Sequence, residues 1–234
     1  MTRVRTPDDL LDLLDALLID RGGVERWDAL FADRPRACPF LVDDPDENLA
    51  GWVEQGLLQP GRALELGCGH GRNAVFLAAH GWDVDAVDLS AQALGWARER
   101  AAAAGVVVTS HHRSLFDLVV EPGAYDLVYD SGCLHHVAPH RRPQYLDLVR
   151  RALAPGGRFG LVCFGPDGGS GLTDAEVYQR RTLGGGLGFS DGQLRALCSD
   201  GFCVEELRPM DPSVPGRFGE GYLTVLLATR VTSG

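Results

Sequence analysis

The sequence predicts an α/β protein built on a doubly wound, mostly parallel β-sheet. From Arg62 onward, short apolar stretches of strand length alternate with longer stretches of helical periodicity, as successive βαβ units require. A glycine-rich turn, Gly67 to Gly71, joins the first of these strands to a helix, and Asp88 ends the second strand. Ligands of this architecture bind beyond the carboxyl ends of the strands, so the turn and Asp88 are expected at one site.

The individual elements follow from periodicity and from end signals. Thr6 and Pro7 start a helix with a leucine stripe, and short helices are expected at 24–31 and 48–58. The alternating part of the chain gives strands at 62–66, 83–88, 106–110, 125–130 and 158–164, with helices at 72–80, 91–104 and 141–153. A helix at 190–199 and two strands, 202–207 and 222–229, follow them.

The chain of 234 residues is long enough for one domain with a substantial core. We assign 1–58 to an N-terminal helical cap of this domain and 59–234 to its ligand-binding part. The glycine-rich segment 165–189 carries one helix-like piece, 173–182. This segment is expected to form either a lid over the substrate or a surface insertion without function.

Composition excludes several classes of function. The net charge of -10 argues against a nucleic-acid partner, which needs a basic face. All 22 basic residues are arginine, so a Schiff-base lysine and a P-loop lysine are both excluded. The six cysteines show no metal-ligand spacing, and no metal site is expected. No apolar run reaches membrane-spanning length and the first residues lack a signal core, which predicts a cytoplasmic protein.

The most informative stretch of the sequence is Ala63-Leu64-Glu65-Leu66-Gly67-Cys68-Gly69-His70-Gly71-Arg72-Asn73. Glu65 stands in an otherwise apolar strand, and the three glycines lie two residues apart. A dinucleotide fingerprint places its third glycine one residue later, so an NAD-dependent oxidoreductase fits less well. A carboxylate at Asp88 suits hydrogen bonds from ribose hydroxyls. The pattern therefore favours a nucleoside-bearing cofactor that lacks a pyrophosphate.

This pattern resembles that of class I S-adenosylmethionine-dependent methyltransferases, in the branch that modifies small molecules. The resemblance continues through 125–130, which corresponds to the family's fourth strand, and through 153–157, the turn into the fifth. It covers residues 50–165. It implies a seven-stranded, mostly parallel, Rossmann-like sheet with one reversed edge strand, and S-adenosyl-L-methionine as the cofactor.

The resemblance also implies which residues hold the cofactor. Asp88 takes the ribose hydroxyls, Glu65 acts on the turn or on the methionine ammonium, and the start of helix 72–80 meets the methionine carboxylate. The position facing adenine falls on Ser114 and Leu115, with Asp117 as an alternative. The cofactor-binding candidates are Glu65, Gly67, Cys68, Gly69, Gly71, Arg72, Asn73, Asp88, Leu89, Ser114, Leu115 and Asp130.

Methyl transfer from a sulfonium needs alignment and exclusion of water more than covalent help. His135 and His136, just after the fourth strand, are candidates for a general base or a substrate hydrogen-bond partner. Structural roles for both histidines stay open. The candidate substrate contacts are Trp27, Phe31, Phe40 and Tyr178. The three N-terminal aromatic residues among them also fit a plain hydrophobic cap.

The predicted function is transfer of a methyl group from S-adenosylmethionine to O, N or S of a small molecule, with specialised metabolism as a setting. A thiol or chalcogen detoxifying methyltransferase and a non-catalytic S-adenosylmethionine-binding partner protein remain alternatives. No Asn-Pro-Pro-Tyr or Asp-Pro-Pro-Tyr stretch occurs, which disfavours methylation of a flipped DNA base. We expect a monomer or a homodimer, with no nucleic acid and no membrane among its partners.

Overall fold

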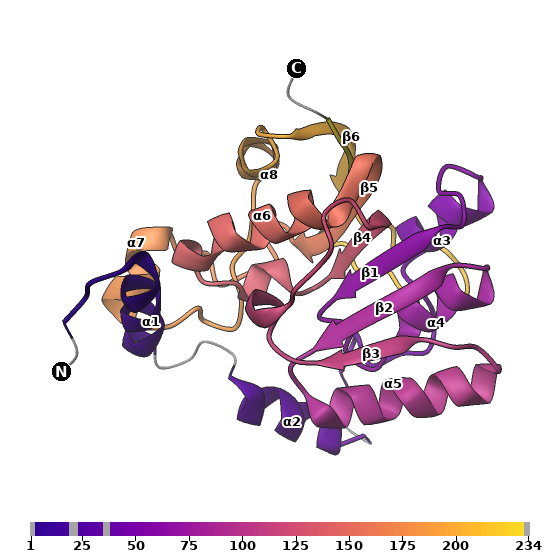
Figure 1. Ribbon diagram of the computed structural model, residues 1–234, viewed down its shortest axis with the longest axis horizontal. Coiled ribbons are helices and arrows are strands. Elements are labelled where there is room, and N and C mark those ends of the chain that lie inside the picture. The colour runs from indigo at the N-terminus through magenta and orange to yellow at the C-terminus, as the bar shows by residue number, and fades with distance from the viewer. Residues whose placement is uncertain (1–2, 19–22, 35–37, 232–234) are drawn as a thin grey trace.

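The computed structural model describes residues 3–18, 23–34 and 38–231. Its central layer is a seven-stranded sheet (Figure 1) with the order β3 (Thr109–His112), β2 (Asp83–Asp88), β1 (Arg62–Leu66), β4 (Tyr125–Ser131), β5 (Leu153–Phe164), β7 (Leu223–Arg230) and β6 (Phe202–Pro209). Of these strands, β7 alone runs antiparallel to its neighbours. The predicted fold class is confirmed, and the reversed strand lies one position in from the edge that β6 forms.

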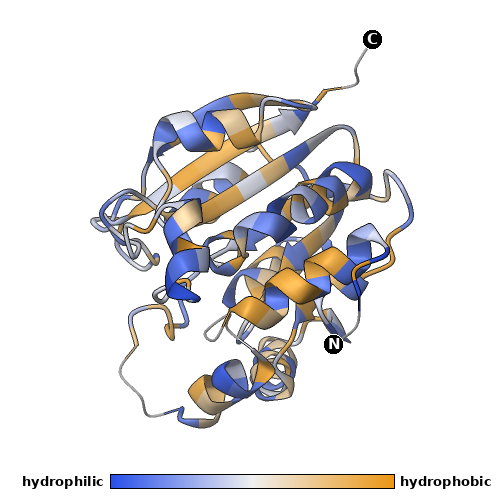
Figure 2. Cartoon of the chain, turned by 90° about the vertical axis from the view of Figure 1, so that its left-hand side faces the viewer, coloured by the Kyte–Doolittle hydropathy of each residue, from blue (hydrophilic) through white to orange (hydrophobic). Residues whose placement is uncertain are grey.

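Helices cover both faces of the sheet, and β1 is therefore buried on both sides. Leu64 and Leu66 belong to the apolar cluster that includes α6 (Arg142–Ala152) and α8 (Asp191–Leu197). Ala63 belongs to a second cluster, together with α3 (Glu47–Glu54), α4 (Arg72–Ala79) and α5 (Ala91–Ala104). Figure 2 shows the apolar residues running along the strands between these helices. Successive strand residues therefore point to opposite layers, and Glu65 points toward the α3 and α4 side.

The carboxyl ends of the parallel strands meet at one edge of the sheet. In the register of β1, Leu66 pairs with Val87 of β2 and with Asp130 of β4. Ser131 of β4 then pairs with Val162 of β5. The loops that follow these strands consequently lie side by side, which is the arrangement that builds a binding site in doubly wound folds.

The predicted N-terminal cap, 1–58, spreads over three places in the molecule. Helix α1 (Pro7–Leu17) lies beside α7 (Asp174–Arg180) in Figure 1, and the Arg181 guanidinium donates to the Leu17 carbonyl at 2.8 Å. Helix α2 (Val24–Ala32) lies along α5 instead, while α3 packs on the sheet. Parts of this predicted cap, 1–2, 19–22 and 35–37, lie outside the described residues.

The glycine-rich segment 165–189 is packed onto the end of the sheet. The last residues of the segment form two backbone hydrogen bonds to the rest of the chain. The Leu187 N–H donates to the His135 carbonyl at 2.8 Å, and the Phe189 N–H donates to the Phe164 carbonyl at 2.9 Å. Leu187 and Phe189 are buried. A Cβ on Gly169 would lie 2.1 Å from the Gly188 nitrogen, so glycine is required where the two arms of the segment pass.

Strand β3 begins later than the sequence predicts, at Thr109 instead of residue 106. Gly105 caps α5 in the left-handed conformation, and the Val106 N–H donates to the Ala101 carbonyl. The N–H group of Val106 therefore ends the helix and does not pair with β2. Val107 is 85% exposed, which excludes it from the buried strand that its apolar character predicted.

Candidate functional site

A cavity of about 850 Å³ opens over the carboxyl ends of β1, β2, β4 and β5. This volume falls in the range that small-molecule and cofactor sites occupy. The walls come from the glycine turn, from α2, from the residues after β4, and from the loop that precedes β7. The cavity therefore lies where the topology of the sheet places a ligand site.

The glycine turn forms the floor of this cavity. Gly67 has φ +64°, and a Cβ there would lie 2.9 Å from the Cβ of Cys133. Gly71 has φ +80° at the start of α4, where a Cβ would lie 2.7 Å from that of Ala97. Both positions need glycine for conformation and for space, so the turn keeps its backbone open toward the cavity.

Asp88 is held rigidly at the end of β2 with both carboxylate oxygens at the cavity. One oxygen accepts a hydrogen bond from the Gly69 N–H at 2.8 Å, and the other accepts one from the Ser90 N–H at 2.8 Å. Burial raises the pKa of Asp88, although these two N–H groups favour its charged form. Each oxygen can accept a further hydrogen bond, which leaves the carboxylate ready for a pair of hydroxyls.

Glu65 lines the cavity from the middle of β1 and is only 2% exposed. Its Oε2 has no hydrogen-bond partner among the described residues. Burial, and next the nearby charge of Asp46, raise the pKa of Glu65 to about 8. A buried carboxylate oxygen without a partner is costly, so this position suits a cationic ligand group.

Arg72 is the first residue of α4 and reaches from the glycine turn toward the N-terminal segments. Its guanidinium donates to Asp46 Oδ1 at 2.5 Å and to the Phe40 carbonyl at 2.8 Å. It also lies 4.0 Å from the ring centre of Phe218. Its Nε–H lines up with none of these groups and has no partner among the described residues. A buried N–H donor thus stands beside the cavity without a hydrogen-bond partner.

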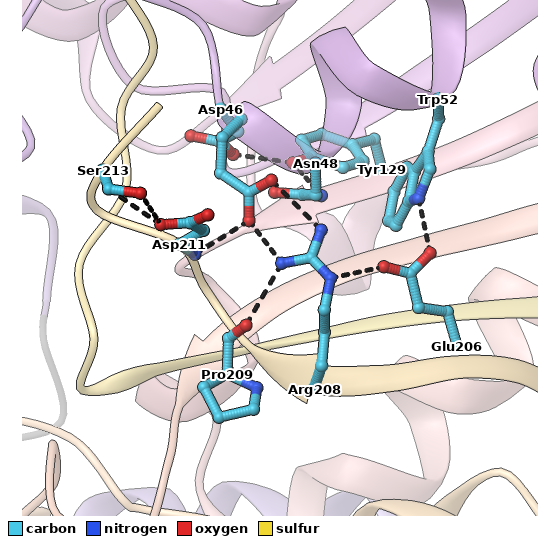
Figure 3. A network of polar contacts seen from close by, with 10 residues as sticks. Asp46, Asn48, Trp52, Tyr129, Glu206, Arg208, Pro209, Asp211 and Ser213 are labelled. Carbon is cyan, nitrogen blue, oxygen red and sulfur yellow. Dashed lines mark hydrogen bonds and ion pairs between the residues drawn. The ribbon is translucent and has the colours of Figure 1, made fainter. Parts of the chain in front are cut away.

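Asp46 directly precedes α3, and its carboxylate links this end of the helix to the sheet by a hydrogen bond (Figure 3). Its Oδ2 accepts a hydrogen bond from the Tyr129 hydroxyl at 2.6 Å. The same oxygen accepts a second hydrogen bond, from the Asn73 amide at 3.0 Å. On the outer side, Arg208 of β6 donates to the carboxylate of Glu47 at 2.5 Å. This polar network holds the cavity wall by hydrogen bonds to α4, to β4 and to β6.

The far end of the cavity, beyond Asp88, contains the predicted adenine contacts. Leu89, Ser114 and Leu115 all line it. The Ser114 hydroxyl accepts the Phe116 N–H at 3.2 Å, as the cap of the short 3₁₀ helix η1 (Leu115–Asp117). Asp117, the predicted alternative, is not among the lining residues.

His135 and His136 lie in the 3₁₀ helix η2 (Leu134–His136), after β4, and both line the cavity. His135 stacks on Phe164 with ring centres 3.7 Å apart, and its Nδ1 accepts the Phe164 N–H at 3.1 Å. Its Nε2 lies 3.1 Å from Nε2 of His136. Burial, and next the neighbouring His136, lower the pKa of His135 well below its ordinary value, so His135 is neutral.

Aromatic rings form part of the cavity wall. The predicted substrate contacts Trp27, Phe31 and Phe40 all line the cavity. The edge of Trp27 approaches His136, with ring centres 4.8 Å apart. An apolar, aromatic wall of this kind binds flat or apolar ligands through their surface.

Three predicted site residues lie outside the cavity wall: Gly71, Asp130 and Tyr178. Asp130 accepts from the Cys133 N–H at 2.7 Å and from the Tyr145 hydroxyl at 2.6 Å, so it shapes the turn after β4 from below. Burial raises the pKa of Asp130 to about 7. The Tyr178 hydroxyl bonds to the His140 ring, which joins α7 to the residues that precede α6. Its predicted contact with substrate finds no support in this placement.

Among the residues that the sequence did not predict for the site are four of the cavity wall, His70, Phe164, Phe218 and Tyr222, and Asp46, which supports the wall through Arg72. Phe164 ends β5 and Tyr222 directly precedes β7. Their positions at strand ends were available from the sequence and indicate the same edge of the sheet. Asp46 carried no comparable signal, because its partners Arg72 and Tyr129 are far from it in the chain.

Two features are absent from the described ranges, 3–18, 23–34 and 38–231. No group of three or more His, Cys, Asp or Glu side chains is placed to hold a metal ion. No helix there combines the length and apolar character needed to cross a membrane.

Residues 63–157 match a family described as a methyltransferase domain. An uncharacterized methyltransferase of Synechocystis sp. is 37% identical over 119 residues, which are 50% of this chain and 51% of that protein. The chain thus spans about half the length of this relative. A 2-heptyl-1-hydroxyquinolin-4(1H)-one methyltransferase of Mycobacteroides abscessus is 25% identical over 172 residues, covering 73% of this chain and 71% of that protein.

Solved structures share the fold over most of the chain. The 1,6-didemethyltoxoflavin-N1-methyltransferase of Burkholderia thailandensis, with bound S-adenosylhomocysteine, superposes with a TM-score of 0.64 at 20% identity, over 99% of this chain and 93% of its own. The magnesium protoporphyrin IX methyltransferase of Synechocystis gives a TM-score of 0.63 at 22% identity, over 88% and 97%. At these identities the likeness establishes the fold alone.

The strand order, the glycine turn after β1 and the acid that ends β2 define a class I methyltransferase domain. The match over 63–157 agrees that this stretch is a methyltransferase domain, and the resemblance of its motifs implies S-adenosylmethionine as the cofactor. The cavity fits that cofactor on its own evidence. At Gly67 the turn has no room for a Cβ, which would lie 2.9 Å from that of Cys133, and the buried Glu65 carboxylate has an oxygen without a partner among the described residues.

Proposed function

We propose that this protein transfers a methyl group from S-adenosylmethionine to an O, N or S atom of a small molecule. One observation carries the proposal: the cavity has Asp88, with lone pairs left on both oxygens, and Glu65, with an unpartnered oxygen, on its wall. These two carboxylates match two groups of the cofactor that donate hydrogen bonds, the ribose diol and the methionine ammonium.

The residues that would hold the methyl donor follow from this match. Glu65 receives the ammonium, and Asp88 receives the ribose hydroxyls. The unpartnered Nε–H of Arg72 and the N-terminus of α4 face the methionine carboxylate, because helix N-termini attract anions. Leu89 and Leu115 give apolar surface to the adenine.

When bound, S-adenosylmethionine supplies a methyl group on a sulfonium, which is already an activated leaving group. The chain's own contribution is to align the acceptor with that methyl group and to exclude water. Trp27 and Phe164 give apolar surface to the space beside the histidine pair. This wall supports a small acceptor with an aromatic or apolar body.

The test is turnover with a panel of thiols, phenols and aromatic amines. Mass spectrometry should detect a product heavier by one methyl group, with S-adenosylhomocysteine formed in equal amount. Tight donor binding without any product across such a panel would favour a non-catalytic partner protein instead.

The aromatic wall gives a variant that separates acceptor from donor. Trp27→Ala removes apolar surface from the acceptor space, so the KM for the acceptor should rise about tenfold or more, from lost burial of 1.5–3 kcal/mol. Donor affinity should not change. Val119→Ala, at a position that is 86% exposed, is the matched control and should leave both constants unchanged.

A further inference from the structure

Helix α2 carries a carboxylate that is bonded to the start of α5. Asp28 Oδ1 accepts a hydrogen bond from the Ser90 hydroxyl at 2.6 Å and a longer one from the Gln92 N–H at 3.3 Å. Ser90 is fully buried and is the N-cap of α5. The bond from the Ser90 hydroxyl lowers the pKa of Asp28, and the N-terminus of a helix also favours a negative charge. An ionised Asp28 thus binds α2 to the first turn of α5.

Ser90 also helps to hold Asp88. Its backbone N–H donates to Asp88 Oδ1 at 2.8 Å, and its Oγ accepts the Ala93 N–H at 3.1 Å. A hydroxyl has one proton to donate, and that of Ser90 goes to Asp28. Ser90 therefore joins the carboxylate of α2 to the carboxylate that the proposed function assigns to the ribose.

A second residue of α2 contacts the other group that holds Asp88. A Cβ on Gly69 would lie 3.2 Å from Cζ of Phe31, so the phenyl ring lies against this glycine. The Gly69 N–H is the second backbone donor to Asp88, at 2.8 Å. Phe31 is buried and lines the cavity. Both residues that donate to Asp88 are thus in contact with α2.

The same helix presents Trp27 to the acceptor side of the cavity. Trp27 directly precedes Asp28 and lines the cavity, with its ring edge-on to His136 and 4.8 Å between the ring centres. Side chains of one helix move with its backbone, so the place of the Trp27 ring depends on where α2 lies. A misplacement of about 1 Å can lower the rate strongly when a reaction depends on alignment, as methyl transfer does.

A second pair of side chains joins this part of the chain to α5, beyond the end of α2. Arg34, two residues after α2, pairs with Glu99 of α5 at 2.7 Å. Solvent screens this pair, because both side chains are about half exposed or more. Neither residue is among those described for the cavity wall. The pair between Arg34 and Glu99 is therefore a matched control for the bond between Asp28 and Ser90.

We propose that Asp28 is a positioning residue for methyl transfer: its bond to Ser90 fixes Trp27, on the acceptor side, relative to Asp88, on the donor side, and couples the two. This inference rests on the proposed function, which assigns both sides. Asp28 is outside the described cavity wall and acts through α2 and Ser90. A ligand held by Asp88 orders the two residues on which α2 rests, so donor binding and the docking of α2 favour each other.

The first test follows the contact between Trp27 and His136 without any turnover. Proton NMR of the free protein detects the imidazole C–H signals of His136, assigned with His136→Gln, and the ring current of Trp27 displaces these signals. Asp28→Ala should move them toward their positions in Trp27→Ala. Asp28→Asn keeps an oxygen that accepts from the Ser90 hydroxyl and the Gln92 N–H, so it should keep the wild-type signals.

Arg34→Gln is the control for this test. It removes a contact with α5 that has no part in the cavity wall, so the His136 signals should stay as in the wild type. Unchanged His136 signals in Asp28→Ala, or an equal displacement in Arg34→Gln, would overturn the proposal. Either result would leave the proposed function untouched, because no substrate is present.

The second test separates positioning from a purely structural role by kinetics at a saturating donor concentration. A structural role lowers the fraction of active protein, which lowers kcat and leaves the KM for the acceptor unchanged. In Asp28→Ala we expect the acceptor KM to rise about fivefold or more, and Asp28→Asn should restore it. A fall in kcat alone would contradict the positioning role. No turnover by the wild type with any acceptor would contradict the proposed function, and the His136 signals would still decide this proposal.

The wild type supplies a measurement that does not depend on the folding of any variant. Gln92 lies in the first turn of α5, where N–H groups have no partner within the helix, and its N–H donates to Asp28. Its exchange with deuterium, followed by NMR, therefore reports the docking of α2. S-adenosylhomocysteine, once calorimetry has shown that it binds, should slow this exchange about threefold or more. An exchange rate at Gln92 that the bound ligand leaves unchanged would overturn the proposal, whether or not Asp28→Ala folds.

Discussion

Glu65 and Asp88 are carboxylates on neighbouring strands, and they differ in how many hydrogen bonds the protein donates to them. Asp88 accepts two backbone N–H groups, whereas Glu65 keeps one oxygen without a partner. The raised pKa of Glu65, about 8, reflects burial first and Asp46 second. Near neutral pH the free protein therefore keeps Glu65 protonated. A cation that binds next to Glu65 lowers the pKa of this carboxyl and favours its ionised form.

Ligand binding should consequently release a proton from Glu65. Near pH 7 the methionine ammonium of S-adenosylhomocysteine favours the ionised carboxylate, so binding should release up to about one proton. Calorimetry in buffers of different ionisation heat measures this number directly.

Glu65→Gln should bind without releasing a proton, while Glu54→Gln, a change on an exposed side chain, should behave like the wild type. Binding by the wild type with no proton exchange near pH 7 would show that Glu65 does not meet the ammonium.

The raised pKa of Glu65 makes the free energy of unfolding depend on pH. Because the folded pKa of Glu65 is raised from 4.5 to about 8, the protonated carboxyl favours the native state. Its contribution is complete below pH 4.5 and is lost as the pH rises through about 8. Denaturant titrations of the free protein should show a falling free energy of unfolding across this window, and Glu65→Gln should flatten it. An equal slope in both proteins would contradict the assignment.

At the residue scale, local sequence features indicate some residues of the candidate site and give no sign of others. Asp88 could be proposed from the sequence, because the end of a strand and the distance of that end from the glycine turn are local features. Asp46 could not, since its bond to Arg72 spans 26 positions and its bond to Tyr129 spans 83. Tyr178 lies outside the cavity wall, and no pattern in the 165–189 segment indicates how its side chain packs.

At the scale of elements, the strand–turn–helix unit from β1 to α4 depends on Gly67. Gly67→Ala adds a Cβ 2.9 Å from that of Cys133, at a φ of +64° that alanine rarely adopts. We expect a loss of about 1–3 kcal/mol in the free energy of unfolding, with weaker cofactor binding. Denaturant unfolding and calorimetry measure the two effects.

The matched control for this change is Gly95→Ala in α5. A Cβ at Gly95 meets nothing within 4 Å. Alanine in a helix is favoured over glycine by roughly 0.5–1 kcal/mol, so this variant should be at least as stable as the wild type. Equal behaviour of the two variants would mean that the turn does not need its left-handed glycine.

Elements with clear ends were predicted to the residue. β1, β2 and α5 have the predicted bounds, because an apolar core, a turn and a cap define each of them. β5 begins at Leu153, five positions before the prediction, since Tyr125 of β4 pairs with it across a bulge. Pairing between distant strands, which a single sequence does not display, set that boundary.

At the scale of the whole molecule, the buried network around Asp46 joins the N-terminal segments to the core. Asp46→Asn leaves Arg72 with an uncompensated charge and weakens the bond to Tyr129. Breaking a buried ion pair from one side costs about 3–5 kcal/mol, and we expect a loss of that size in chemical denaturation.

The control for Asp46 is the exposed pair between Arg34 and Glu99, where both side chains are about half exposed or more, 48% and 62%. Arg34→Gln should leave the midpoint of unfolding unchanged, because solvent screens such pairs. A loss in Asp46→Asn no larger than in Arg34→Gln would show that the network does not hold the cap.

The central claim is that the cavity binds S-adenosylmethionine through Asp88, and one measurement tests it directly. Calorimetry should compare the affinity for S-adenosylhomocysteine of the wild type, Asp88→Asn and Asp83→Asn, the last at the far, exposed end of the same strand. Loss of charge-assisted bonds worth about 1.5–3 kcal/mol predicts a fall of roughly 10- to 100-fold for Asp88→Asn alone. No binding by the wild type, or equal binding by all three proteins, would contradict the account.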